Sequence, residues 1–310
     1  MTAPLDGNHD PHLRAGATRI ATTDGNHDPH ATTSAALVAV AHGSRDPRSA
    51  ASATALIDVV RLMRPELDVR LAFLELSAPR LPDVLAAVAD DGHRAAVVVP
   101  LLLGNAYHAR VDVPRTVCAA QNRLPRLDVH IAQVLGPDPR LPSAALRRLA
   151  ATGAALDDPD LGVVLAAAGS SHQPANDAVT AIAANWSTKA PWRGALPALA
   201  TTAPESVRSA MASLRRRGAR RIAVASWFLS PGVLPDRITS AALATDPQAL
   251  IADPLGSDPE LAQIVLDRYR QAPALWPTAA YLAPPRNPRT ESCNMRTETD
   301  DTPKACGVSR

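Results

Sequence analysis

Residues 37–44, LVAVAHGS, and residues 163–170, VVLAAAGS, decide the fold. Each stretch has five apolar residues followed by a three-residue turn that ends in Gly-Ser. This pattern is typical of a buried strand that leads into a helix. The two stretches lie 126 residues apart, which raises the question of whether the whole chain is duplicated.

Further landmarks recur in the same order at nearly the same offset. The matched pairs are Pro79 with Pro204 at 125, Gly92 with Gly218 at 126, and LGPDP at 135–139 with LGSDP at 255–259 at 120. An ordered set of landmarks with nearly constant offsets indicates an internal duplication, so we predict two similar lobes.

Short apolar runs alternate with segments of helical character. We expect strands at 37–41, 69–74, 95–103, 129–134 and 163–167, and helices at 46–63, 79–89, 113–124 and 142–151. Continuous apolar strands separated by helices favour an α/β fold in which helices cover both faces of a parallel sheet. Gly153, Asp157, Asp158 and Pro159 mark the join between the lobes.

The two ends of the chain differ from the middle. Residues 1–34 contain the heptapeptide DGNHDPH twice, with four of the nine histidines (His9, His12, His27 and His30), and residues 281–310 are rich in polar residues and proline. Such segments bury little apolar surface, so we expect disordered tails flanking lobes at 35–152 and 160–280. Cys293 and Cys306 in the second tail are too few for an iron–sulfur cluster.

The composition excludes several classes of function. Hydrophobic residues make up 46% of the 310 residues and the formal net charge is +2, so the chain can form a core but has no basic excess for nucleic acid. No apolar run approaches the roughly 18 residues of a membrane span. With three cysteines and no signal pattern, we expect a cytoplasmic protein, as a monomer or homodimer.

Three side chains follow the first three strands of the first lobe, namely His42, Glu75 and His108. Ligands of parallel sheets bind beyond the carboxyl ends of the strands, so the three are expected at one edge. Two imidazoles and a carboxylate suit a divalent metal such as Fe²⁺, Co²⁺ or Zn²⁺, and they also accept protons.

The motifs that contain these residues resemble a known family. AHGSR at 41–45, FLE at 73–75, PLLL at 100–103, and His108 with DVP at 112–114 are similar to the class II tetrapyrrole chelatases, especially the sirohydrochlorin chelatases of the CbiX/SirB type. The resemblance covers about residues 36–275. It implies two chelatase-like, flavodoxin-related lobes that enclose a tetrapyrrole.

The resemblance also implies roles for residues. His42, His108 and Glu75 would bind the metal and accept pyrrole protons. The metal, with Fe²⁺ favoured over Co²⁺, is then a substrate, and no organic cofactor is expected. Because sirohydrochlorin has many carboxylates, we expect Arg45, Arg110 and the backbone N–H groups of Gly43 and Ser44 to contact it.

Arg48 and Arg115 also flank the histidine motifs, but for these two the sequence favours solvated surface charges.

The second lobe departs from the motif. The offsets place Ala168, Ala200 and a residue at or near Leu234 where the first lobe has His42, Glu75 and His108. We therefore expect the chemistry in the first lobe.

The main hypothesis is iron insertion into sirohydrochlorin towards siroheme. Three alternatives to it remain, namely cobalt insertion towards cobalamin, a carrier without turnover, and a hydrolase. The hydrolase has no Gly-x-Ser-x-Gly motif to support it.

Overall fold

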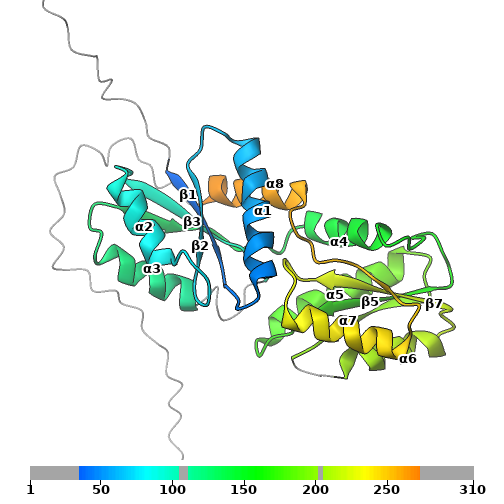
Figure 1. Ribbon diagram of the computed structural model, residues 1–310. Helices are drawn as coiled ribbons and strands as arrows, with labels where there is room; N and C mark the ends of the chain where they lie inside the picture. Colours follow the sequence, from blue (N-terminus) through cyan, green and yellow to red (C-terminus); the bar gives the residue numbers. More distant parts are fainter. Residues whose placement is uncertain (1–34, 105–110, 202–204, 273–310) are drawn as a thin grey trace, which may run out of the picture. The chain divides into compact units, whose positions relative to one another are not determined.

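The computed structural model describes residues 35–104, 111–201 and 205–272. It confirms the predicted α/β fold with two four-stranded parallel sheets (Figure 1). The first sheet has the strand order β2-β1-β3-β4 and the second has β6-β5-β7-β8. The two orders are the same pattern repeated, as expected for a duplicated chain.

The first lobe contains four strands and four helices in alternation. They are β1 (Ala36–Ala41), α1 (Pro47–Met63), β2 (Val69–Phe73), α2 (Leu81–Asp90), β3 (Ala95–Pro100), α3 (Val113–Gln121), β4 (Asp128–Ile131) and α4 (Arg140–Ala150). β3 ends three residues before the expected 103, because the Leu102 N–H donates to Pro100 O and turns the chain out of the ladder.

The second lobe repeats this alternation. Its elements are β5 (Leu161–Ala167), α5 (Gln173–Lys189), β6 (Gly194–Leu199), α6 (Ser206–Arg216), β7 (Arg221–Trp227), α7 (Val233–Thr245), β8 (Leu250–Ile251) and α8 (Pro259–Gln271). Among the described residues, no helix is both long and apolar enough to cross a membrane.

Successive side chains of a strand point to opposite faces of the sheet. In β1, Val38 and Val40 join a core cluster with residues of α2 and α3, whereas Leu37 and Ala39 join another with residues of α1 and α8. Both faces are thus covered, which is why the strands read as unbroken apolar runs.

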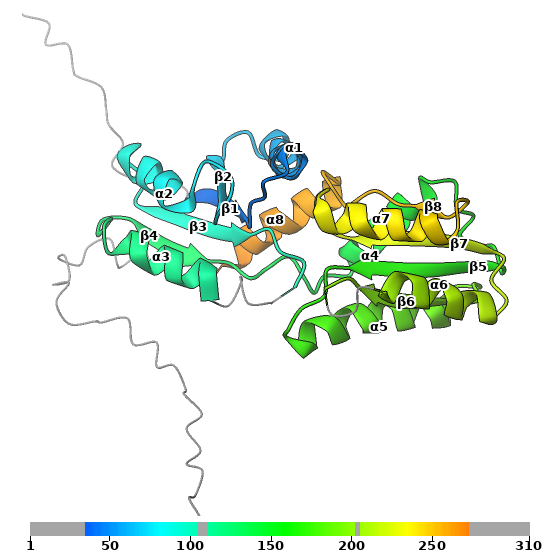
Figure 2. The same ribbon diagram turned by 60° about the horizontal axis from the view of Figure 1, so that its bottom comes forward.

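The last helix of each lobe packs on the other lobe's sheet. α4 contacts β7 and α8, and α8 contacts α1 and β3; Figure 2 shows α8, in orange, beside β1 and β3. The buried guanidinium of Arg268 in α8 donates to Val134 O and Leu135 O, both at 2.8 Å. The Tyr269 hydroxyl donates to Ala35 O at 2.6 Å. The strands before and after the join at 152–160 therefore form separate sheets, whereas α4 and α8 each pack on the sheet of the other lobe.

Candidate metal and tetrapyrrole site

His42 and Glu75 lie side by side at the carboxyl edge of the first sheet. The ladder between β1 and β2 continues one step past both strands, because the Leu74 N–H donates to Ala41 O and the Glu75 N–H donates to His42 O, each at 3.0 Å. The His42 Nε2 atom is 3.1 Å from Glu75 Oε1, and the side chains are 36% and 53% exposed. An imidazole and a carboxylate are thus paired and still accessible to a ligand.

Gly43 makes this close approach possible. Its φ is +95°, and a Cβ atom at this position would lie 1.7 Å from the carbonyl oxygen of Glu75. No side chain fits there, so the glycine of the motif allows the backbone at Glu75 to approach the turn after β1.

A pair of serines fixes the same turn. The Ser44 N–H donates to Ser77 Oγ at 3.1 Å, and the Ser77 hydroxyl donates to Ser44 O at 2.9 Å. The Ser44 N–H that we expected to receive a substrate anion is therefore already engaged. Sequence reasoning missed Ser77, although it is 33 residues from Ser44, the spacing that also separates His42 from Glu75.

Leu76 directly follows Glu75 and is unusual in two respects. Its φ of 63° lies in the left-handed region, which non-glycine residues rarely adopt. The residue is also 47% exposed, among the few large apolar residues that reach solvent in the described part of the chain. An exposed apolar side chain therefore directly follows Glu75 in the chain.

Two arginines flank the start of α1, since Arg45 of the AHGSR motif lies just before it and Arg48 lies in its first turn. Arg48 bonds the carboxylates of Asp46 and of Asp236 in α7, each at 2.5 Å. The hydrogen bond from Arg48 lowers the pKa of Asp46, and the bonds to Asp46 and then Asp236 raise the pKa of Arg48. Arg45 is exposed and has no ion pair with any other described residue. Arg48 is thus committed to a link between the lobes, and Arg45 is available to a ligand.

Two predicted site residues, His108 and Arg110, lie outside the described residues. Within 35–104, 111–201 and 205–272, no group of three or more His, Cys, Asp or Glu side chains is arranged to hold a metal ion. The described part of the chain thus contains two members of the predicted triad, His42 and Glu75, and the third remains a prediction.

The strand registers change the residue of the second lobe that corresponds to Glu75. Ala41 pairs with Phe73 in the first sheet, and Ala167 pairs with Leu199 in the second. The residue two positions after Leu199 is Thr201, which therefore corresponds to Glu75, and the expected Ala200 is wrong by one position. The Thr201 N–H and hydroxyl both donate to Ala168 O, at 2.8 and 2.7 Å.

The expected match between His108 and Leu234 is also wrong. The Leu135 N–H donates to Leu102 O, and Leu255, its counterpart, donates to Phe228 O. From these matched carbonyls, ten residues (103–112) lead to α3 but only four (229–232) lead to α7. The second lobe is six residues shorter at this connection, and its residues 229–232 (LSPG) contain no histidine.

The other histidines of the described residues have local partners. His93 Nε2 lies 3.0 Å from Asp68 Oδ2, and His130 Nε2 lies 3.0 Å from Asp128 Oδ2. His172 is the N-cap residue of α5, and its N–H donates to Ser170 Oγ at 3.0 Å. These contacts are local and give the three histidines structural roles apart from the candidate site.

Comparison with known proteins gives two curated relatives. The sirohydrochlorin ferrochelatase of Bacillus subtilis (strain 168) is 25% identical over 207 residues, which are 66% of this chain and 78% of that protein. The sirohydrochlorin ferrochelatase of Priestia megaterium is 27% identical over 196 residues, or 62% of this chain and 73% of that protein.

Solved structures show the same fold. SirB from Bacillus subtilis with Fe³⁺ has a TM-score of 0.66 at 24% identity, and the match covers 77% of this chain and 95% of that one. The sirohydrochlorin chelatase SirB from Bacillus subtilis subspecies spizizenii in complex with cobalt has a TM-score of 0.62 at 22% identity, covering 76% and 94%. At these identities the likeness establishes the fold alone.

A family model described as CbiX matches the chain twice, at residues 36–152 and 162–272. The two matches coincide with the two sheets and together span most of the chain. On this basis the chain belongs to the CbiX/SirB sirohydrochlorin chelatase family.

Proposed function

We propose that this protein is a sirohydrochlorin chelatase that inserts a divalent metal, preferably Fe²⁺, into sirohydrochlorin in siroheme biosynthesis. The observation that carries the proposal is the pairing of His42 with Glu75 at 3.1 Å, at a sheet edge where both side chains are partly exposed. Membership of the CbiX/SirB family supports the choice of substrate.

Metal insertion breaks two pyrrole N–H bonds and forms bonds from the metal to the ring nitrogens, so two protons leave the macrocycle. In our proposal His42 accepts a proton as general base, and Glu75, bonded to its Nε2 atom, stabilises the imidazolium and passes the proton to solvent. His108 is proposed as a further base and metal ligand. The same side chains hold the incoming metal weakly, because an incomplete ligand set allows its transfer to the macrocycle.

The surroundings of the pair suit a macrocycle with an apolar face and an anionic rim. Leu76 presents an exposed apolar side chain beside Glu75, where it can contact the ring. Arg45 has no ion pair among the described residues, so its guanidinium is proposed to bind a carboxylate of the substrate. Arg110 is proposed for the same role.

Cobalt insertion is the second candidate, because a related SirB was solved in complex with cobalt. Histidine and carboxylate ligands bind Fe²⁺ and Co²⁺ with similar geometry, and affinities rise from iron to cobalt in the divalent series. The ligand set is therefore compatible with both metals, and the proposal for iron rests on the names of the two curated relatives.

The test is an anaerobic assay with the full chain, metal-free sirohydrochlorin, and Fe²⁺, Co²⁺ or Ni²⁺ in separate reactions. The absorption change on metal insertion is followed against the spontaneous rate. We expect acceleration with Fe²⁺ and with Co²⁺. A protein that binds sirohydrochlorin but accelerates insertion of none of the three metals would be a carrier, and the proposal would be wrong.

A further inference from the structure

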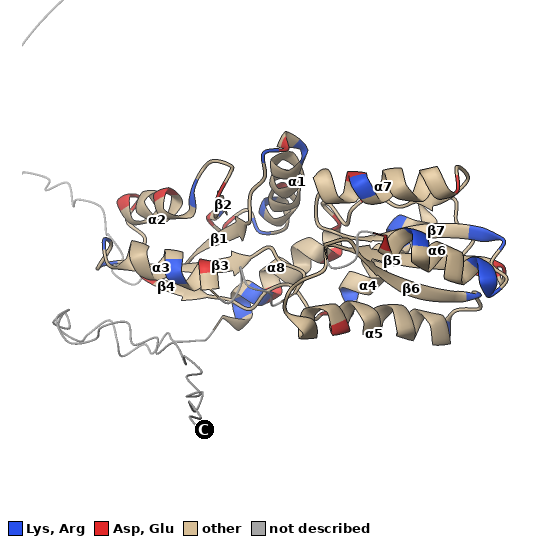
Figure 3. Cartoon of the chain, turned by 90° about the horizontal axis from the view of Figure 1, so that it is seen from below, with Lys and Arg blue, Asp and Glu red and all other residues tan. Residues whose placement is uncertain are grey.

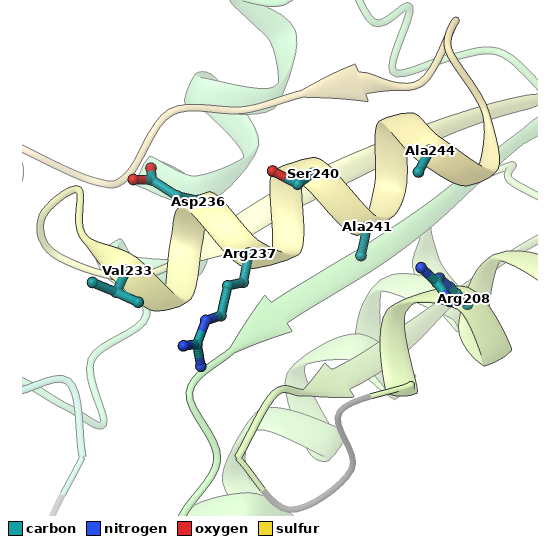
Figure 4. A pocket seen from close by; sticks show the side chains of 7 residues that line it. All are labelled: Arg208, Val233, Asp236, Arg237, Ser240, Ala241 and Ala244. Carbon is teal, nitrogen blue, oxygen red and sulfur yellow. The ribbon is translucent and has the colours of Figure 1, made fainter.

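The second lobe has an open groove on its surface between α6 and α7. The groove has a volume of about 560 Å³, and the residues that give it its charge are Arg208, Asp236 and Arg237. Figure 4 shows that Arg237 extends from α7 on the side where α6 carries Arg208, whereas Asp236 extends from another side of the helix. The groove therefore has a basic side formed by two helices.

The carboxylate of Asp236 in this groove is bonded by a residue of the first lobe. Asp236 and Arg237 are the charged residues of α7 and form its adjoining acidic and basic segments in Figure 3. The guanidinium of Arg48 bonds both carboxylate oxygens of Asp236. Arg237 is exposed and has no ion pair or hydrogen bond within the described residues. Asp236 is thus bonded to Arg48, which it shares with Asp46, and not to Arg237.

Arg208 adds a second cation to the groove. Its guanidinium lies 3.2 Å from Glu205, one turn earlier, and the two side chains are 55% and 71% exposed. Such exposed pairs contribute little energy, so an incoming carboxylate can compete for Arg208. Ser240 also lines the groove, and its side chain extends on the side of α7 that carries Asp236 (Figure 4).

The start of α7 lies beside the start of α1. Arg48 in the first turn of α1 reaches Asp236, and the hydroxyl of Ser52 in the next turn donates to Leu229 O just before α7. The turn with His42 and Gly43 leads directly into α1. The contacts of α1 therefore connect the His42 turn to the helix that bears Arg237.

We propose that the α6–α7 groove binds peripheral carboxylates of the tetrapyrrole, with Arg237 as the principal contact, while the first lobe acts on the ring nitrogens. This inference rests on the proposed function and adds a binding role for the second lobe, which lacks counterparts of the histidines. Arg48 acts as a positioning residue, because it occupies Asp236 and holds the start of α7 next to α1.

The test compares wild-type protein with Arg237→Gln and Arg237→Lys, by fluorescence titration of metal-free sirohydrochlorin and by steady-state metal insertion. Arg216→Gln is the matched control, because Arg216 in α6 is also exposed, bonds Ser213 as its one side-chain partner within the described residues, and does not line the groove. Loss of a charge-assisted hydrogen bond predicts that Arg237→Gln weakens binding and raises KM by about tenfold with kcat unchanged. Arg237→Lys should recover part of the affinity.

Three results would overturn the inference: an unchanged dissociation constant in Arg237→Gln, equal weakening in Arg216→Gln, or a fall in kcat alone. These results are distinct from failure of the proposed function, in which wild-type protein itself does not accelerate insertion.

Discussion

The Nε2 atom of His42 lies 3.1 Å from Oε1 of Glu75, whereas the corresponding positions of the second lobe hold Ala168 and Thr201. Thr201 uses its hydroxyl to bond Ala168 O, so the second turn is closed by a local hydrogen bond. The same backbone arrangement therefore exists without the acid–base pair. The turn does not need His42 or Glu75 for its structure, which makes the second lobe an internal control for their roles.

Glu75→Gln keeps the size of the side chain and removes its charge. We expect the rate of metal insertion to fall by about 10²-fold, because the amide neither accepts a proton nor stabilises an imidazolium at His42. Thr201→Val, the corresponding change in the second lobe, should leave the rate within about twofold. Initial rates at saturating sirohydrochlorin measure both, and equal rates in wild type and Glu75→Gln would remove Glu75 from the mechanism.

Gly43→Ala should disrupt the site, since the new Cβ would lie 1.7 Å from Glu75 O. Gly92→Ala is the matched control, because Gly92 has a φ of +90° but no atom within 4 Å of an added Cβ. We expect Gly92→Ala to cost about 1–2 kcal/mol from backbone strain alone. Gly43→Ala should cost more and also lower the insertion rate. Urea unfolding measures both costs, and equal values would show that the close approach has no energetic role.

Arg268 should contribute strongly to stability, because its buried guanidinium bonds the backbone oxygens of Val134 and Leu135 from the opposite half of the chain. Arg268→Met would leave those carbonyls without these donors, at a cost of about 3 kcal/mol. Arg270→Met, which removes an exposed pair with Asp267, should cost less than about 1 kcal/mol. Similar urea midpoints for the two variants would contradict a stabilising role for α8 on the sheet of the first lobe.

Acid should weaken the link between α4 and α8. The hydrogen bond from Arg140 holds the pKa of Asp138 below its ordinary value of 3.8, and Arg140 also bonds Asp267 in α8. A carboxyl group with a lowered folded-state pKa stabilises the protein above its unfolded-state pKa. That contribution is lost as the pH falls below 3.8. Asp138→Asn should therefore flatten the fall in unfolding free energy between about pH 5 and pH 2, and an unchanged slope would contradict this.

The order of strands and helices was predictable from the sequence, because strands covered on both faces read as apolar runs such as 37–41. The packing of α4 and α8 was not. An amphipathic pattern shows which face of a helix is buried, but not which sheet covers it. The pairing of Arg268 with Val134 depends on contacts between segments far apart in the chain.

The site was predictable to the extent that it follows strand ends. His42 and Glu75 follow neighbouring strands, and the structure brings them together. The counterparts in the second lobe could be identified only from the structure. The landmark offsets of 126, 125 and 120 show that the two lobes differ in length, but they do not show where. The hydrogen bonds after β3 and β7 and the starts of α3 and α7 assign the length difference to the connection before α7, and the strand registers identify Thr201 as the counterpart of Glu75.

The most direct test of the account is the rate of metal insertion into sirohydrochlorin by His42→Ala compared with wild type, under identical anaerobic conditions with Fe²⁺. Because His42 is proposed as both base and metal ligand, we predict that wild type exceeds the spontaneous rate and that the variant loses about 10²-fold or more of that acceleration. A correctly folded His42→Ala protein with the wild-type rate would contradict the proposed chemistry at this site.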